Sequence, residues 1–250
     1  MKLTILGSGT GAPSLARSSP AYLLEAHGLQ CLVDCGSGTL RQLLRAGTGC
    51  HSLDAVFVTH THPDHIGDLI ALIHALKVTP GLHREKPLHL FGPRGFVEFH
   101  AQCIAAVATP PKHFRIVVRE AASRQAFAGL QVRSGATLHS PGLHSLAYRF
   151  EQDGRAVVFS GDCDYDPGIV ALAGNADLLV LDCSFPDHLK VKGHLSAGEC
   201  GRIAREAGVR QLVLSHLYPV DPCADTRLDE ARTACTCPVC LAEDLMELHC

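Results

Sequence analysis

Residues 60–65, His60-Thr61-His62-Pro63-Asp64-His65, place four side chains that can bind a metal within six positions. They follow the apolar, strand-like run 55–58 and precede a helical apolar pattern over residues 66–77. Imidazole nitrogens and carboxylate oxygens together suit zinc and its neighbours among the transition metals. The stretch therefore predicts a turn between a strand and a helix whose side chains converge on one or two cations.

Polar residues also stand where other predicted strands end. An acid or a histidine closes the apolar runs that lead to Asp34, Asp162, Asp182 and His216. Because buried strands deliver their last residues to a common rim on a rigid scaffold, we expect these side chains near residues 60–65. Two metal ions about 3.5–4 Å apart need a bridging ligand, and Asp162, which follows Ser160-Gly161, is the candidate.

The composition excludes several classes of protein. The chain has 250 residues, of which 46% are hydrophobic, so it can bury a core and is not disordered. Its net charge of −3 excludes a broad basic surface for duplex nucleic acid. No apolar run approaches the roughly 20 residues that cross a bilayer, and the start, MKLTILGSG, is unlike a signal peptide. We expect a cytoplasmic protein that does not contact membranes.

Strand-type runs alternate with helical periodicity along the whole chain, and no repeat or linker divides it. Helices are expected at residues 39–46, 66–77, 96–107, 167–173 and 197–207. This alternation predicts one α/β domain over residues 1–250. Residues 7–12 fit the dinucleotide-binding G-x-G-x-x-G/A pattern, but Pro13 follows where a helix would have to begin, so no nucleotide cofactor is expected.

Taken together, these residues resemble the metallo-β-lactamase superfamily of hydrolases. The H-x-H-x-D-H stretch, a later histidine, Ser160-Gly161-Asp162 and the strand-end His216 carry this resemblance over essentially the whole chain. Further stretches are similar to the ribonuclease Z branch: residues 6–10, 34–39, 175–180 and 193–196. The resemblance implies a four-layer αββα sandwich with metals at one edge of two facing sheets.

The resemblance also implies a ligand set. The first ion would be held by His60, His62 and His139, and the second by Asp64, His65 and His216, with Asp162 between them. Two divalent ions are implied, with Zn2+ expected and Mn2+ or Fe2+ as alternatives. His144 lies close to His139 in the sequence and is the alternative third histidine.

Three residues are assigned catalytic roles. Asp64 is expected to orient the attacking hydroxide as well as to bind metal. His194 precedes a helix that Ser196 and Glu199 would cap, and the flanking Lys190 and Lys192 suggest a phosphoryl-oxygen site. Asp182 stands where the branch has the glutamate of its H-E-A-T stretch.

The substrate class follows from what the chain lacks. Only 23 residues separate His139 from Asp162, which leaves no room for the arm with which ribonuclease Z enzymes grip transfer RNA. We therefore expect a phosphodiesterase that attacks a small or short nucleotide-like phosphodiester through a metal-bound hydroxide, without tight binding of full-length transfer RNA. Hydrolysis of thioesters or lactones, and genuine processing of the transfer RNA 3′ end, remain alternatives. A homodimer is compatible with the sequence.

The chain contains 12 cysteines, and three of them are close together at Cys235, Cys237 and Cys240. Cys237 and Cys240 form a single C-x2-C pair, with no second pair to complete a zinc site. Packing thiols are the expected interpretation, and a further metal site is the alternative.

Overall fold

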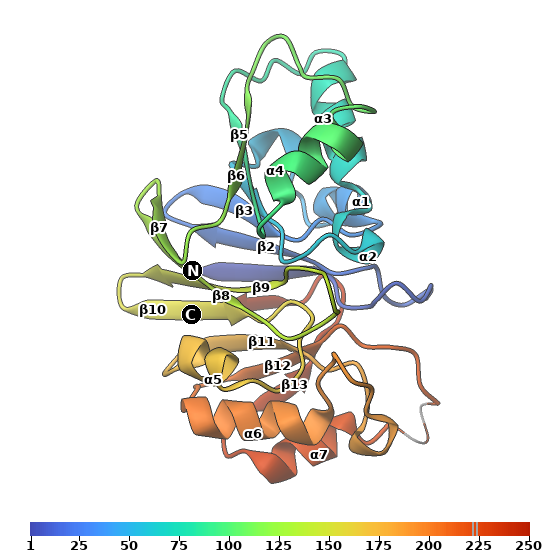
Figure 1. Cartoon of the computed structure of the whole chain (residues 1–250), viewed down its shortest axis with the longest axis vertical. Coiled ribbons are helices and arrows are strands. Elements are labelled where there is room, and N and C mark those ends of the chain that lie inside the picture. The colour runs from blue at the N-terminus through green and yellow to red at the C-terminus, as the bar shows by residue number, and fades with distance from the viewer. Residues whose placement is uncertain (222, 224) are drawn as a thin grey trace.

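The computed structural model describes residues 1–221, 223 and 225–250, and it contains two sheets of seven strands each (Figure 1). The order in the first sheet is β14-β1-β2-β3-β4-β5-β6, and in the second β13-β12-β11-β10-β9-β8-β7. The first sheet consists of β1 (Lys2–Gly7), β2 (Ala21–Ala26), β3 (Leu29–Val33), β4 (Ala55–Phe57), β5 (Leu88–Gly92), β6 (Ile116–Glu120) and β14 (Glu247–His249). The second consists of β7 (Arg124–Phe127), β8 (Leu130–Ala136), β9 (Leu146–Gln152), β10 (Arg155–Phe159), β11 (Leu178–Asp182), β12 (Leu212–Ser215) and β13 (Val239–Leu241).

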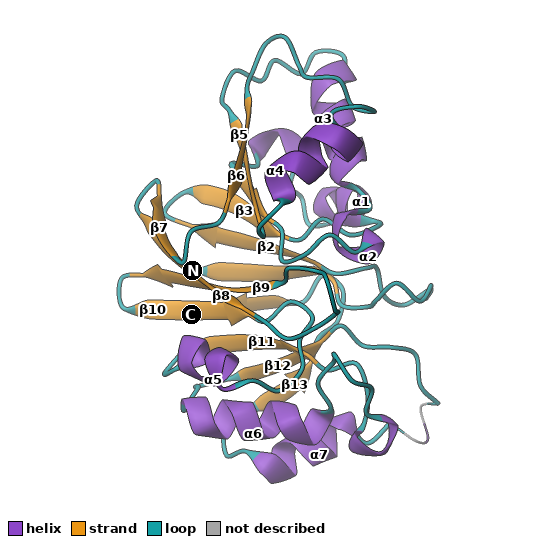
Figure 2. Cartoon of the chain, in the orientation of Figure 1, coloured by secondary structure: helices purple, strands orange, loops and turns teal. Residues whose placement is uncertain are grey.

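Helices cover the outer face of each sheet (Figure 2). The first sheet carries α1 (Thr39–Arg45), α2 (Pro63–Ile66), α3 (Leu69–Val78) and α4 (Phe96–Phe99), and the second carries α5 (Pro167–Ala173), α6 (Ala197–Ala207) and α7 (Arg227–Ala234). The inner faces pack on each other, with Phe57 of the first sheet in edge-on contact with Phe150 of the second at 5.0 Å between ring centroids. The predicted αββα sandwich is confirmed.

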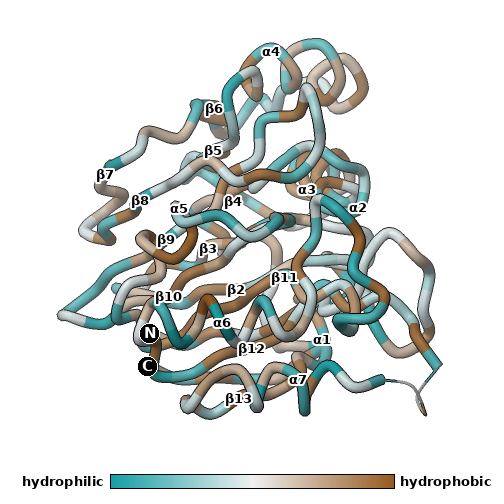
Figure 3. Tube along the Cα trace, turned by 60° about the horizontal axis from the view of Figure 1, so that its bottom comes forward, coloured by the Kyte–Doolittle hydropathy of each residue, from teal (hydrophilic) through white to brown (hydrophobic). Residues whose placement is uncertain are grey.

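Hydrophobic residues are concentrated on the strands, whereas the peripheral loops are mostly hydrophilic (Figure 3). This pattern yields three apolar clusters: one between the sheets and one under the helices on each side. No helix among the described residues is long and apolar enough to span a bilayer.

Parallel strands bring the candidate residues together. In the first sheet β3, β4, β5 and β6 are parallel, and in the second so are β10, β11, β12 and β13. Residues that follow the carboxyl ends of β3, β4, β10, β11 and β12 therefore meet at one edge of the sandwich. Two of them, Asp34 and His216, adopt left-handed backbone conformations, with φ of 59° and 55°. Such conformations are costly outside glycine and gather at functional sites.

The helix predicted over residues 66–77 is interrupted. Two helices occupy this region instead of one: α2 ends at Ile66, and α3 begins at Leu69. The break occurs because Gly67 and Asp68 contact the neighbouring loop. A Cβ on Gly67 would lie 2.3 Å from Ser37 Oγ, and the Asp68 amide donates to the Cys35 carbonyl at 3.0 Å. The helix predicted over residues 96–107 is also wrong in extent, since α4 ends at residue 99 and one π-helical turn follows.

Candidate metal centre

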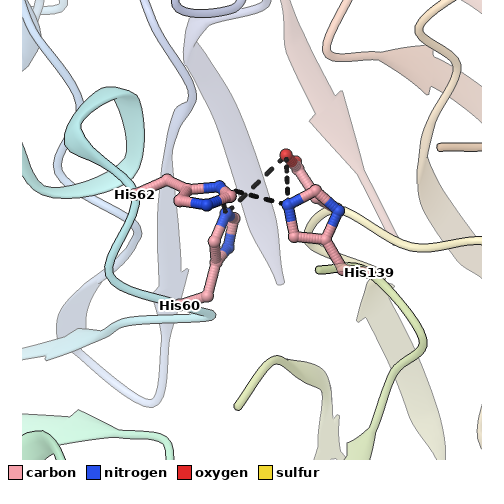
Figure 4. A group of neighbouring side chains, drawn as sticks. His60, His62 and His139 are labelled. Carbon is pink, nitrogen blue, oxygen red and sulfur yellow. Dashed lines mark hydrogen bonds and ion pairs between the residues drawn. The ribbon is translucent and has the colours of Figure 1, made fainter. Parts of the chain in front are cut away.

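Three imidazole rings form one group of donors (Figure 4). His60 Nε2 and His139 Nε2 each lie 3.1 Å from His62 Nδ1. His62 precedes Pro63, which favours an extended backbone, and its ψ of 147° is accordingly extended. Asp162 Oδ2 completes the group, at 3.7 Å from His60 Nε2 and 3.6 Å from His139 Nε2.

The second group of donors lies on the other side of the same carboxylate. Asp162 Oδ1 is 3.1 Å from His65 Nε2 and 3.2 Å from His216 Nε2. Asp64 Oδ2 is 3.8 Å from His65 Nε2 and 3.5 Å from His216 Nε2. The two oxygens of Asp162 thus face different donor groups, which is the geometry of a bridging ligand.

The donor atoms fit divalent cations. Donors bonded at about 2.0–2.1 Å to a tetrahedral ion lie roughly 3.3 Å from one another, close to the spacing within each group. Buried polar atoms normally have partners, yet His65 Nε2, Asp162 Oδ1 and His216 Nε2 have no hydrogen-bond partner among the described residues. In the described part of the chain, no lysine or arginine pairs with Asp34, Asp64, Asp162 or Asp182. A buried negative charge of this kind calls for a cation.

The protonation states also suit metal binding. Burial lowers the pKa of His60 to about 2 and also lowers the pKa of His62, so both rings are neutral and keep a lone pair. Burial opposes ionisation of Asp64, but the hydrogen bond and charges of His216 and His65 lower its pKa to about 2. Metal ligation needs neutral imidazole and ionised carboxylate, and His60, His62 and Asp64 supply both. At His65 and His216 burial opposes protonation, but the charge of Asp162 outweighs it and raises the pKa of His65 to about 10 and that of His216 well above its usual value, so an ion in the second group would displace these protons.

A hydroxyl relay fixes the orientation of two rings. Thr59 donates from its amide to Asp34 Oδ1 at 2.7 Å and from Oγ1 to Asp34 Oδ2 at 2.9 Å. Because the Thr59 hydrogen is used in this way, its oxygen accepts from His60 Nδ1 at 3.0 Å. His65 Nδ1 donates directly to Asp34 Oδ2 at 2.8 Å. These bonds leave Nε2 of His60 unprotonated, and they aim Nε2 of both rings at the site.

A second relay of the same kind serves the other sheet. Ser184 Oγ donates to Asp182 Oδ1 at 2.7 Å and accepts from His216 Nδ1 at 3.0 Å. His139 Nδ1 donates to the Gly193 carbonyl at 2.8 Å. The Nδ1 atoms of His60, His65, His139 and His216 are therefore all held from behind.

His194 lies beside the two donor groups. Its ring is stacked on His216 at 5.4 Å and edge-on to His139 at 4.9 Å. His194 Nδ1 donates to Asp182 Oδ2 at 2.9 Å, while the side chain keeps 14% exposure. Burial alone would lower the pKa of His194, but the hydrogen bond and charge of Asp182 outweigh it and raise the pKa. The ring can therefore be held protonated with Nε2 turned away from Asp182.

The structure changes the interpretation of two neighbours of His194. The buried side chain of Asp182, predicted to be catalytic, lies behind His194 and His216, and its oxygens are 2.9 Å from His194 Nδ1 and 3.5 Å from His216 Nδ1, so it is placed to position both rings. Lys190 was expected to contribute to a phosphate site, but its ammonium group pairs with Asp164 at 2.7 Å and with Glu199. The predicted capping box of Ser196 and Glu199 is present.

The structure bears on two alternatives that the sequence leaves open: the identity of the third histidine, and a further metal site at the clustered cysteines. His139 joins His60 and His62, whereas His144 is exposed. Cys235 Sγ and Cys237 Sγ lie 3.8 Å apart under the outer helices, while Cys240 packs between the sheets. Because Cys237 packs under the outer helices and Cys240 between the sheets, the structure does not bring this C-x2-C pair together.

Sequence reasoning missed the roles of Asp34, Thr59 and Ser184. Asp34 follows a predicted strand and Thr59 directly precedes His60, so both residues stand at positions that the sequence marks as close to the site. Which of these polar residues hold the ligands depends on contacts across the sheets. A cleft of about 500 Å³ opens beside Asp64, lined in part by Thr10, Gly11 and Ser37.

Comparison with known proteins agrees with this geometry. The family model described as the beta-lactamase superfamily domain matches residues 30–217. The ribonuclease Z of Archaeoglobus fulgidus is 31% identical over 305 aligned positions, which cover 99% of this chain and 97% of that protein. Because this chain has only 250 residues, at least 55 of those positions have no counterpart in it.

Two crystal structures share the whole fold. The metallo-beta-lactamase fold protein YhfI from Bacillus subtilis has a TM-score of 0.88 and 28% identity, with 99% of this chain and 98% of that chain covered. The short form of human tRNase Z has a TM-score of 0.82 and 24% identity, with 100% and 99% covered.

Proposed function

The chain belongs to the beta-lactamase superfamily and is a ribonuclease Z-like, metal-dependent hydrolase, and we propose that it cleaves a small or short nucleotide-like phosphodiester. The observation that carries this proposal is the position of Asp162, whose two oxygens face two separate donor groups. Two ions on such a bridge suit phosphodiester hydrolysis, because the attacking and the leaving oxygen can both be stabilised. We propose His60, His62 and His139 for one ion, and Asp64, His65 and His216 for the other.

The chemistry that divalent ions held by these residues would supply, with Zn2+ as the proposed metal, is a lowered pKa of bound water and polarisation of a phosphoryl oxygen. Asp64 lies at the cleft with an ionised carboxylate, so it can both bind metal and accept a hydrogen bond from the attacking water. Asp34 and Asp182 hold the ligand rings through Thr59 and Ser184, which fixes the direction of each lone pair.

His194 is proposed to protonate the leaving group. Its Nδ1 is occupied by Asp182, so Nε2 is the nitrogen that remains for the substrate. No described residue forms a hydrogen bond with that atom, and the ring keeps partial exposure beside His139 and His216. General acid catalysis typically contributes about 10²–10⁴-fold in rate, most for a leaving group that is a strong base.

The size of the chain supports a short substrate. The chain lacks at least 55 positions of its alignment with the Archaeoglobus ribonuclease Z, and only 23 positions lead from His139 to Asp162 in the sequence. The net charge of −3 offers little to a large polyanion. The names ribonuclease Z and tRNase Z of the relatives keep transfer RNA as the second candidate substrate.

The proposal is tested on purified protein with measured metal content. We expect about two ions per chain and turnover of bis(p-nitrophenyl) phosphate or cyclic nucleotides, with much less turnover of thioesters. Turnover of thioesters alone would refute the phosphodiesterase proposal. Accurate cleavage of a transfer RNA precursor would replace the short substrate by transfer RNA.

A further inference from the structure

Asp164 connects the two loops that carry His139 and His194. Its amide donates to the carbonyl of Leu138 at 2.6 Å, and its Oδ2 accepts from the amide of Gly193 at 2.9 Å. One residue thus binds the backbone directly before each of these histidines. It lies two positions after Asp162 and takes no part in either donor group.

The other oxygen of Asp164 holds a lysine. Asp164 Oδ1 accepts from Lys190 Nζ at 2.7 Å, and the same ammonium group also pairs with Glu199. Glu199 in turn accepts from the amide of Ser196 at 3.0 Å, as part of the cap of α6. The loop 190–196 is therefore fixed on both sides of His194.

Gly193 connects Asp164 to the side chain of His139. Its carbonyl accepts from His139 Nδ1 at 2.8 Å, and its φ of 92° lies in the left-handed region. A Cβ at this position would lie 2.6 Å from the His139 carbonyl oxygen, so the two segments approach as closely as glycine permits. Asp164, Gly193 and His139 form one continuous chain of hydrogen bonds.

We propose that Asp164 is a positioning residue that sets His194 against the leaving group and, through Gly193, sets His139 against its metal, with Lys190 holding Asp164 in place. This inference rests on the proposed function, because it assigns His194 to the leaving group. A misplacement of about 1 Å at a reacting group can cost about 10²-fold in rate, so a residue outside the centre can matter this much.

The test compares Asp164→Ala and Lys190→Ala with Lys192→Ala as the matched control. Lys192 lies in the same loop, is exposed, and forms no ion pair among the described residues. In the metal-free protein, we expect at least about tenfold faster hydrogen exchange of the Gly193 amide in Asp164→Ala, because that amide loses its acceptor. Zinc affinity should fall by about 10–100-fold, as for other groups behind a ligand. Lys190→Ala should show the same changes to a smaller degree. Lys192→Ala should alter neither the Gly193 exchange nor the zinc affinity, and because Lys192 is part of the predicted phosphoryl-oxygen site, it serves as a control for these two measurements only.

Turnover then tests the link to His194 in the metal-loaded enzyme. Two phosphodiesters that differ only in the leaving group, p-nitrophenolate or an alkoxide, are compared. Asp164→Ala should lose about 10²-fold in kcat/KM with the alkoxide and clearly less with p-nitrophenolate, like His194→Ala. The double variant Asp164→Ala/His194→Ala should have nearly the same kcat/KM with the alkoxide substrate as His194→Ala alone.

Each outcome decides the proposal. Unchanged zinc affinity in Asp164→Ala, or an equal loss with both leaving groups, would overturn it and leave Asp164 a stabilising residue only. If the wild type turns over no phosphodiester, the proposed function fails, and zinc affinity with Gly193 exchange still decides whether Asp164 positions His139.

Discussion

Replacing Asp34 by asparagine should disable both donor groups while leaving the fold intact. Asp34 has a φ of 59°, and asparagine tolerates this conformation better than alanine, so the substitution adds little backbone strain. The change removes one acceptor and adds a donor. The Thr59 amide still requires an oxygen, which places the new NH2 group at the position of Oδ2.

That NH2 group would face Thr59 Oγ1 and His65 Nδ1, which both donate to Asp34 Oδ2 in the wild type. His65 would have to move its proton to Nε2, and Thr59 would have to donate to His60 instead of accepting from it. Either change protonates a nitrogen that is aimed at metal. A disturbed partner behind one ligand typically costs about 10–100-fold in metal affinity, and here two ligands are affected.

The assay is competition for zinc against a chelator, together with metal content after dialysis and thermal unfolding of the metal-free protein. We expect affinity to fall by at least about tenfold, and the free energy of unfolding of the metal-free protein by about 1–3 kcal/mol for the unmatched donor. Asp153→Asn is the matched control, since Asp153 has a φ of 51° but is exposed in the turn between β9 and β10. Two ions bound at wild-type affinity in Asp34→Asn would refute the relay.

Four further outcomes are expected. Asp162→Ala should lose both ions and all activity together, and retention of full turnover with one tightly bound ion would exclude bridging. His194→Ala should keep its metal content, measured by elemental analysis, and lose about 10²–10⁴-fold in turnover of alkoxide diesters; loss of metal would make His194 a ligand. Full-length transfer RNA should show no tight, steeply salt-dependent complex in a filter-binding titration, and a nanomolar complex would contradict the short-substrate proposal. Burial opposes ionisation of Asp177, but its bond to Arg155 at 2.7 Å lowers its pKa below the usual value. The ionised carboxylate therefore stabilises the folded protein fully above about pH 4, and this stabilisation is lost as the pH falls further. The free energy of unfolding, measured against pH, should fall less steeply in acid for Asp177→Asn than for the wild type.

Much of the fold could be predicted because the pattern of apolar runs is local. The ends of α2 and α3 could not, because the break depends on Ser37 and Cys35, which are distant in the sequence from Gly67 and Asp68. The edge strands β6 and β7 and helix α7 were not predicted either, since they bury few residues and lack a clear apolar period.

Within the site, the residue types and their spacing indicated which side chains meet, but not their bonds. Lys190 illustrates this difference. Its place beside His194 suggested a free positive charge, yet Asp164 and Glu199 take up that charge from two other segments. A sequence reveals which groups can ionise, whereas the partner of each group depends on how distant loops pack.

The division of the ligands between the sheets has a consequence for how the protein matures. His60, His62, Asp64 and His65 come from the first sheet, whereas His139, Asp162 and His216 come from the second. Each of the two proposed donor groups draws on both sheets, so its full set of ligands is assembled only when the sheets have packed on each other. Ion capture by the full set then follows closure of the whole sandwich, and by mass action it favours the closed state by about 4 kcal/mol when free metal exceeds its Kd a thousandfold. When metal is scarce, the amount of this protein should therefore fall through proteolysis, in addition to the loss of its activity.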